Sequence, residues 1–149
     1  MNDLLQRRFA RANLLYVDLV ETLSAEQLGS TLADLPSDTI GHQLWCVLGA
    51  RESYPRAARA GEWQGFTSPV SGAELTDPQA LRAAFDTTAA DVDAWLAGIP
   101  ADDEDSLTYA LALLEHETQH HGQLIRYLYG LGIPRPGSWQ RQYALDEDF

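Results

Sequence analysis

The sequence predicts an all-α fold, a four-helix bundle with a long crossover between its second and third helices. Apolar residues recur at helical spacing in four stretches, capping residues and glycines separate these stretches, and no stretch shows a credible strand pattern. The chain has 149 residues, which is the size of one domain, so a single helical domain over residues 1–149 is expected.

The first helix is expected over about residues 3–23, because apolar residues recur there every three or four positions. These residues are Leu4, Leu5, Phe9, Ala12, Leu15, Tyr16, Leu19 and Leu23. Ser24 and Gln27 then have the spacing of a capping box, which predicts a short turn or helix. A second helix is expected over about residues 38–60, with Gly61 as its stop.

The next segment predicts the crossover. Residues 61–76 contain three glycines and show no sustained period, so they are interpreted as a connection of about 16 residues. A connection of this length can cross the length of a bundle. Asp77 followed by Pro78 predicts the start of the third helix, an N-cap and then a first-turn proline, and this helix is expected to end at Gly98.

The fourth helix is expected over about residues 106–131. The acidic run 102–105 precedes it and is interpreted as a solvated helix start rather than a cation site, because negative charge is favourable at a helix N-terminus. From about residue 132 an irregular C-terminal tail is expected, in which Trp139 and Tyr143 are candidates to pack against the bundle.

Composition and charge exclude several classes of function. The net charge is −12, and a surface this acidic repels phosphate backbones, so no nucleic-acid binding is expected. All ten cationic residues are arginine, which excludes lysine-based covalent catalysis. No stretch approaches the roughly 18 apolar residues of a membrane span, so no membrane partner is expected. The single cysteine, Cys46, suits a reducing cytosol and predicts a cytoplasmic protein.

All four histidines lie in two short places, His42 in the second predicted helix and His116, His120 and His121 in the fourth. Two residues four apart on a helix are rotated by roughly 40°, so His116 and His120 share a face. His121 lies roughly 140° round the helix from His116 and points elsewhere. Three neutral imidazoles leave a divalent ion with open positions, as in catalytic sites. We therefore predict a metal site on His42, His116 and His120.

Other interpretations of these histidines stay open. They could be ordinary capping or core residues. The run from His116 to His120 also matches the H-E-x-x-H motif of metallopeptidases, in which Glu117 would be the general base. The metallopeptidase interpretation needs a third metal ligand later in the chain than His120. The only acidic residues there lie in the C-terminal tail, so a metallopeptidase is the less favoured alternative. Glu117 lies about 100° off the ligand face and could equally be exposed to solvent.

Two neighbours of the predicted site have more than one possible role. Cys46 follows His42 by four residues and shares its face, so its thiolate could be a fourth ligand, although free cysteines are more often plain core residues. Gln123 follows His120 by three residues. It could hold the hydrogen bond that a metal-binding imidazole needs on its other nitrogen, or it could simply pack between helices.

The string H-E-T-Q-H-H-G-Q-L from His116 to Leu124, with Ile40-Gly41-His42 some 74 residues before it, resembles the DinB/YfiT-like family of metalloenzymes. The resemblance covers nearly the whole chain. It implies a four-helix bundle, often a homodimer, that holds nickel, zinc or a similar divalent ion on three histidines matching His42, His116 and His120. The departure from the family pattern is His121, where arginine is usual.

The resemblance also implies an activity. Family members with assigned reactions include thiol-dependent S-transferases that use bacillithiol or glutathione-like cofactors. This chain is therefore expected to be a metal-dependent transferase or hydrolase acting on a small electrophile, with a low-molecular-weight thiol as a further cofactor. The alternative is a non-catalytic metal-binding or stress-response homodimer. An open pocket at the metal favours catalysis, whereas a closed tetrahedral shell favours a structural role.

Overall fold

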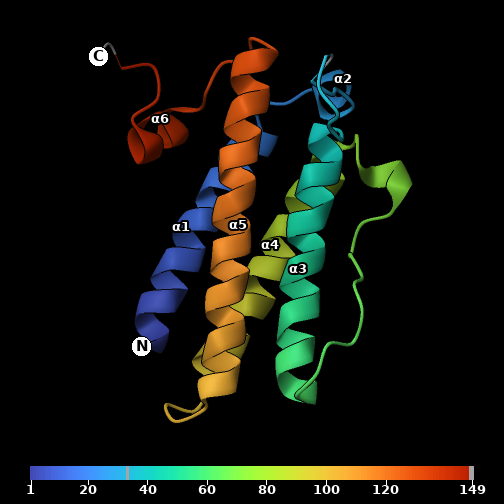
Figure 1. The fold of residues 1–149 in the computed structure, drawn as a ribbon. Helices are drawn as coiled ribbons and strands as arrows, with labels where there is room; N and C mark the ends of the chain where they lie inside the picture. The colour runs from blue at the N-terminus through green and yellow to red at the C-terminus, as the bar shows by residue number, and fades with distance from the viewer. Residues whose placement is uncertain (33, 148–149) are drawn as a thin grey trace.

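The computed structural model describes residues 1–32 and 34–147, and the regular structure in these ranges is entirely helical (Figure 1). The elements are α1 (Asn2–Val20), α2 (Ala25–Leu28), α3 (Ile40–Ala60), the 3-10 turn η1 (Gly72–Glu74), α4 (Pro78–Ala97), α5 (Glu104–Gly130) and α6 (Gly137–Tyr143). The predicted all-α class is thus confirmed for the described part of the chain. No helix there is both long enough and apolar enough to cross a membrane.

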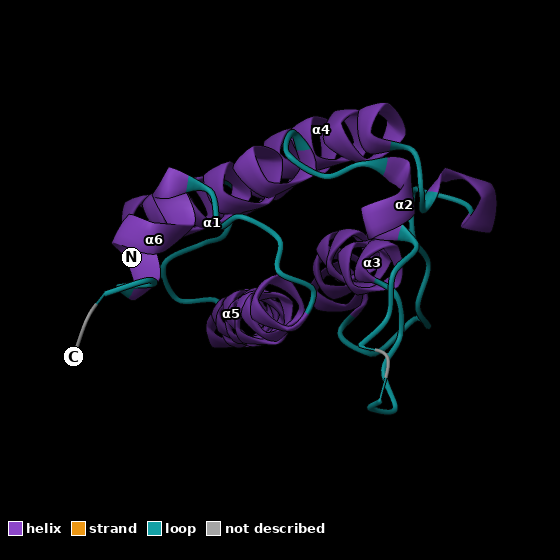
Figure 2. Ribbon diagram, turned by 90° about the horizontal axis from the view of Figure 1, so that it is seen from above, coloured by secondary structure: helices purple, strands orange, loops and turns teal. Residues whose placement is uncertain are grey.

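The four long helices pack in two layers, α1 with α4 and α3 with α5 (Figure 2). Helix α4 also contacts α3, and α5 also contacts α1, so the four helices form a closed ring. Helices α1 and α5 run in one direction and α3 and α4 in the other (Figure 1). Because α3 and α4 are parallel, the chain between them has to travel the full length of the bundle. The segment 61–77 does this along the outside of α3. The sequence predicted a connection that could cross the bundle over residues 61–76.

Several helix ends lie where the capping residues predicted them. Ser24 and Gln27 form the capping box in front of α2. Gly61 ends α3 in the left-handed conformation, with φ of 73°, which a glycine adopts at little cost. The Asp77 carboxylate accepts hydrogen bonds from the backbone of the first turn of α4, where Pro78 is the first helical residue.

Three predicted boundaries differ from the structure by a few residues. Helix α1 ends at Val20, although the apolar pattern in the sequence continues to Leu23. Helix α3 begins at Ile40, because the Thr39 hydroxyl caps it by accepting a hydrogen bond from the backbone N–H of His42. Helix α5 begins earlier than predicted, because Asp103 is its N-cap and Glu104 and Asp105 lie in its first turn.

The prediction of an irregular C-terminal tail was wrong in part. Residues 137–143 form the short helix α6, which contacts α1. Trp139 on this helix is completely buried, and its indole Nε1 donates a 2.7 Å hydrogen bond to the backbone oxygen of Leu15. The expected packing of Trp139 on the bundle is therefore confirmed. A helix of seven residues is too short to show a period in the sequence, and its contact with α1 stabilises it instead.

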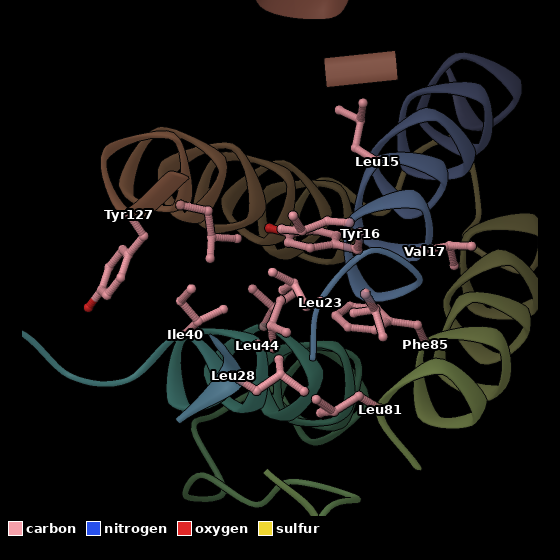
Figure 3. Packing of buried hydrophobic residues seen from close by; sticks show 14 of the residues in the cluster. Leu15, Tyr16, Val17, Leu23, Leu28, Ile40, Leu44, Leu81, Phe85 and Tyr127 are labelled. Atoms are coloured by element: carbon pink, nitrogen blue, oxygen red, sulfur yellow. The ribbon is translucent and has the colours of Figure 1, made fainter. Parts of the chain in front are cut away.

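An apolar core fills the space between the two layers. Its larger cluster takes side chains from all four long helices, among them Tyr16, Leu44, Phe85 and Tyr127, which are at most 3% exposed (Figure 3). A smaller cluster packs around Phe9 and its neighbours. Removing this apolar surface from water is the main favourable term in folding.

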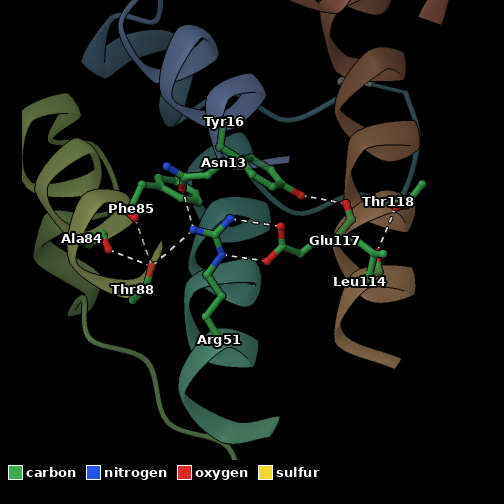
Figure 4. A network of polar contacts seen from close by, with 9 residues as sticks. All are labelled: Asn13, Tyr16, Arg51, Ala84, Phe85, Thr88, Leu114, Glu117 and Thr118. Atoms are coloured by element: carbon green, nitrogen blue, oxygen red, sulfur yellow. Dashed lines mark hydrogen bonds and ion pairs between the residues drawn. The ribbon is translucent and has the colours of Figure 1, made fainter. Parts of the chain in front are cut away.

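A buried ion pair joins the two helices of one layer inside this core (Figure 4). Arg51 on α3 donates two hydrogen bonds to the carboxylate of Glu117 on α5, at 2.7 Å from Nε and 3.0 Å from Nη2. The two side chains are 1% and 0% exposed. The remaining nitrogen, Nη1, donates to Asn13 on α1 at 2.7 Å and to Thr88 on α4 at 3.4 Å. One guanidinium therefore contacts all of the other long helices.

Aromatic rings enclose this ion pair. The guanidinium carbon of Arg51 lies 5.7 Å from the ring centre of Tyr16 and 5.1 Å from that of Phe85. The Tyr16 hydroxyl donates a 2.7 Å hydrogen bond to the backbone oxygen of Glu117. Burial raises the pKa of Tyr16 well above its usual value, so the hydroxyl keeps its proton and remains a donor. The sequence left open whether Glu117 faces solvent, and the structure buries it, with its carboxylate as the partner of Arg51.

Replacing Glu117 by alanine should lower the free energy of unfolding by about 3–5 kcal/mol, because the Arg51 charge would stay buried without its partner. Chemical denaturation measures this loss. Glu115→Ala on the exposed face of α5 is the matched control and should cost less than about 0.5 kcal/mol. The double variant Arg51→Met with Glu117→Leu should recover most of the loss. Equal effects of the two alanine substitutions would contradict this account.

Candidate metal centre

One group of possible metal ligands lies between α3 and α5. It consists of Cys46 from α3 and His116 and His120 from α5, and one ligand atom of each lies within 4.8 Å of the others. The Cys46 sulfur is 3.6 Å from Nε2 of His116. The two imidazole rings have their centres 4.6 Å apart. These three side chains could hold a metal ion.

The helical geometry explains how the group forms. His116 and His120 lie one turn apart, and both face α3, as the sequence predicted. Helix α3 is the partner of α5 in its layer and runs antiparallel to it. The sequence left the role of Cys46 open between ligand and core residue, and the structure places its thiol beside the histidine pair.

The protonation states of the histidines suit metal binding. Burial and then the neighbouring His116 lower the pKa of His120 to about 4. Burial also lowers the pKa of His116. Both imidazoles are therefore neutral at neutral pH, and the neutral form is the one that binds a metal. Burial raises the pKa of the Cys46 thiol, so an ion would have to displace its proton on binding.

A glutamine side chain orients one of the two imidazoles. Nδ1 of His120 lies 2.7 Å from the amide oxygen of Gln43 on α3. An amide oxygen only accepts hydrogen bonds, so Nδ1 of His120 carries the proton and Nε2 has a free lone pair. Metal-binding histidines commonly have such a partner on the other nitrogen. The sequence offered Gln123 for this contact, but Gln43 makes it, and the Gln123 amide oxygen is buried without a partner in the described residues.

His42, the third predicted ligand, lies outside this group. Its Nδ1 is 2.8 Å from the carboxylate of Asp38 one turn earlier, and its side chain is 42% exposed. Its ring packs edge-on against Trp45. His42 is one turn from Cys46 on the same face of α3. The structure thus brings together two of the three predicted histidines and Cys46, while a role for His42 as ligand stays a prediction.

Two other residues of the same run, Glu117 and His121, face away from the group, and the sequence predicted this for His121. His121 is 2% exposed, and its Nδ1 lies 2.7 Å from the Tyr143 hydroxyl of α6. Its ring also lies against Tyr16 and Trp139, with centres 4.4 and 5.1 Å away. His121 therefore holds α6 on the bundle. Glu117 is bonded to Arg51 in the core, so the H-E-x-x-H motif has no free carboxylate to act as a general base.

No protein-family model, curated protein or solved structure matches this chain.

Replacing Gln43 by leucine should weaken zinc binding about 10- to 100-fold, because the His120 imidazole would lose the hydrogen bond that fixes its tautomer and orientation. Competition against a chromogenic chelator measures the affinity. Gln119→Leu, at an exposed position of α5, is the matched control. Parent-like affinity of Gln43→Leu would show that the amide contact has no part in metal binding.

Metal-free protein should lose stability as the pH falls from about 6.5 to about 3. Burial, and after it the charges of Arg51 and His120, lower the pKa of His121 from 6.5 to about 3. Between these values the unfolded chain binds a proton at this position and the folded chain does not, so acid favours unfolding. Denaturation at a series of pH values in the presence of a chelator measures the effect. His121→Gln should show a smaller loss, and parallel curves for variant and parent would contradict this.

Proposed function

We propose that this protein binds a divalent metal ion between α3 and α5 and is a metal-dependent enzyme that acts on small electrophiles, with a low-molecular-weight thiol as co-substrate. The observation that carries the proposal is the convergence of Cys46, His116 and His120, with one ligand atom of each within 4.8 Å of the others. Three protein ligands leave a four-coordinate ion one position for water or substrate.

The path of the chain supports the resemblance to DinB/YfiT-like proteins. Four long helices lie in two layers, and the long connection lies between the second and third of them, α3 and α4. The histidine pair is on the last long helix, and His42 is in the first turn of α3. We therefore propose a DinB-like four-helix bundle to which the short helices α2 and α6 are added.

The donor set favours zinc, with nickel as the next candidate. Thiolate and imidazole suit these borderline ions, whereas magnesium and calcium prefer oxygen ligands. His42 remains a proposed additional ligand, because it lies one turn from Cys46 on the same helix face. Its present partner is the Asp38 carboxylate, so binding an ion would require His42 to leave that contact.

The ion would supply one chemical effect, a lower pKa of a bound thiol or water, which gives a nucleophile at neutral pH. The chain's own residues do the rest. His116 and His120 offer neutral nitrogens, and Gln43 holds the proton of His120 on the nitrogen that faces away from the group. Cys46 and His116 are only partly buried, which favours an open site over a closed structural shell. The catalytic alternative is thus preferred to the structural one.

Zinc-loaded protein, purified without a histidine tag, should contain one zinc per chain after dialysis. His116→Ala and His120→Ala should each reduce this content by at least about tenfold, because two remaining donors bind weakly. Elemental analysis measures the content, and Glu115→Ala is the control. Cobalt-substituted protein should show a thiolate-to-metal absorption band that Cys46→Ser removes. Parent-like zinc content in both histidine variants would refute the proposed centre.

Metal-dependent turnover should appear when a panel of low-molecular-weight thiols is offered with a chromogenic electrophile. Chelation should abolish the reaction, and zinc should restore it. His116→Ala and His120→Ala should be inactive, while Glu115→Ala should keep the parent rate. A rate that chelation leaves unchanged would exclude metal-dependent transfer. Hydrolysis of casein is not expected, since Glu117 is bonded to Arg51.

A further inference from the structure

A pocket of about 330 Å³ lies one side chain away from the metal centre, where the start of α3 faces the later turns of α5. Gln43 connects the two, because it lines the pocket and its amide oxygen accepts the hydrogen bond from His120. The Tyr127 hydroxyl donates a hydrogen bond to the backbone oxygen of Asp38, which ties the two walls of the pocket together. The pocket is therefore a built feature of the α3–α5 layer.

Two amide groups lie in the pocket wall. The Gln123 amide oxygen is buried and has no hydrogen-bond partner among the described residues. A buried acceptor without a donor costs free energy, so a rotation of the Gln123 side chain that turns this oxygen into the pocket would let an N–H group of a ligand remove that cost. The amide oxygen of Gln43 is occupied by His120, so its NH₂ group is the end that remains for an acceptor on a ligand.

The two walls of the pocket carry opposite charges, Arg126 on one and Asp38 on the other. Arg126 on α5 is exposed and forms no ion pair with any residue that the structure describes. A guanidinium in this position suits a carboxylate, which it can bind through two parallel hydrogen bonds. Asp38 on the other wall is half exposed and would repel a multiply charged anion such as phosphate. The same carboxylate can accept a hydrogen bond from an ammonium or amide N–H.

We infer that this pocket binds a small amino-acid derivative, a molecule that carries both a carboxylate and N–H donors. Its carboxylate binds Arg126, and its N–H groups bind Gln123 and Asp38. Gln43 places the molecule next to the His120 ligand, so the pocket holds a substrate or co-substrate of the metal centre. The role as substrate or co-substrate rests on the proposed function, and the inference adds the chemical class of the ligand. Binding itself requires only the pocket.

Glycylglycine is the probe, followed by ¹⁵N NMR of the full-length protein, because the side-chain NH₂ signals of Gln43 and Gln123 report directly on the pocket. These signals should shift and saturate with glycylglycine. Glycylglycinamide lacks the carboxylate, and acetate lacks the N–H groups, so both should give much smaller shifts at equal concentration. Equal shifts with acetate, or none with glycylglycine at tens of millimolar, would overturn the inference.

Two variants localise the binding. Arg126→Gln and Gln123→Leu should each raise the dissociation constant for glycylglycine about tenfold, since each removes one contact to the ligand. Arg141→Gln and Gln119→Leu change the same residue types at exposed positions elsewhere and should leave it unchanged. Equal weakening by pocket and control variants would overturn the inference.

Titrations of zinc-free and zinc-loaded protein, with the zinc content measured in parallel, separate the two proposals. Saturable glycylglycine binding in protein that retains no zinc after zinc loading and dialysis supports the pocket and refutes the metal centre alone. Normal zinc content without glycylglycine binding supports the metal centre and refutes the pocket. Arg126→Gln should keep its zinc, because Arg126 is not a ligand.

Discussion

The buried pair of Arg51 and Glu117 is the interaction on which the rest of this structure depends. A buried ion pair of this kind is weak evidence for stability, but it defines how its two helices are placed against each other. Helices α3 and α5 are antiparallel, so going back along α3 from Arg51 to Cys46 corresponds to going forward along α5 from Glu117 towards His120. The ion pair between Arg51 and Glu117 therefore also sets the register of α3 against α5, and this register brings the Cys46 thiol to the histidine pair.

The run from His116 to His121 on α5 faces three different environments, because successive residues are rotated by about 100° round the helix axis. His116 and His120 face α3 and form the candidate metal centre. Glu117 enters the core, where Arg51 binds it, and His121 faces α1 and α6. This division explains why the H-E-x-x-H motif is misleading here, since its glutamate is used to hold the bundle together and cannot also be a base at the metal.

The candidate metal centre and the pocket both lie in the layer formed by α3 and α5. The early turns of α3 carry Gln43 and Cys46, which contact the histidines of α5, and the pocket opens beside them. Gln43 belongs to both features, so a ligand in the pocket would touch the side chain that orients a metal ligand. This arrangement fits a protein that holds an ion and a small polar molecule side by side, as the proposed reaction requires.

The sequence by itself determined the features that depend on neighbours along the chain. These are the long helices, the caps at Ser24 and Asp77, the long crossover, and the shared face of His116 and His120. Only the tertiary structure decided that Cys46 lies beside the pair while His42 contacts Asp38, that Gln43 rather than Gln123 bonds to His120, and that Glu117 is buried. In the first two cases both residues lie on a suitable helix face. The choice depends on which side chain reaches across the contact between α3 and α5, and helical periodicity along one chain segment carries no information about that distance.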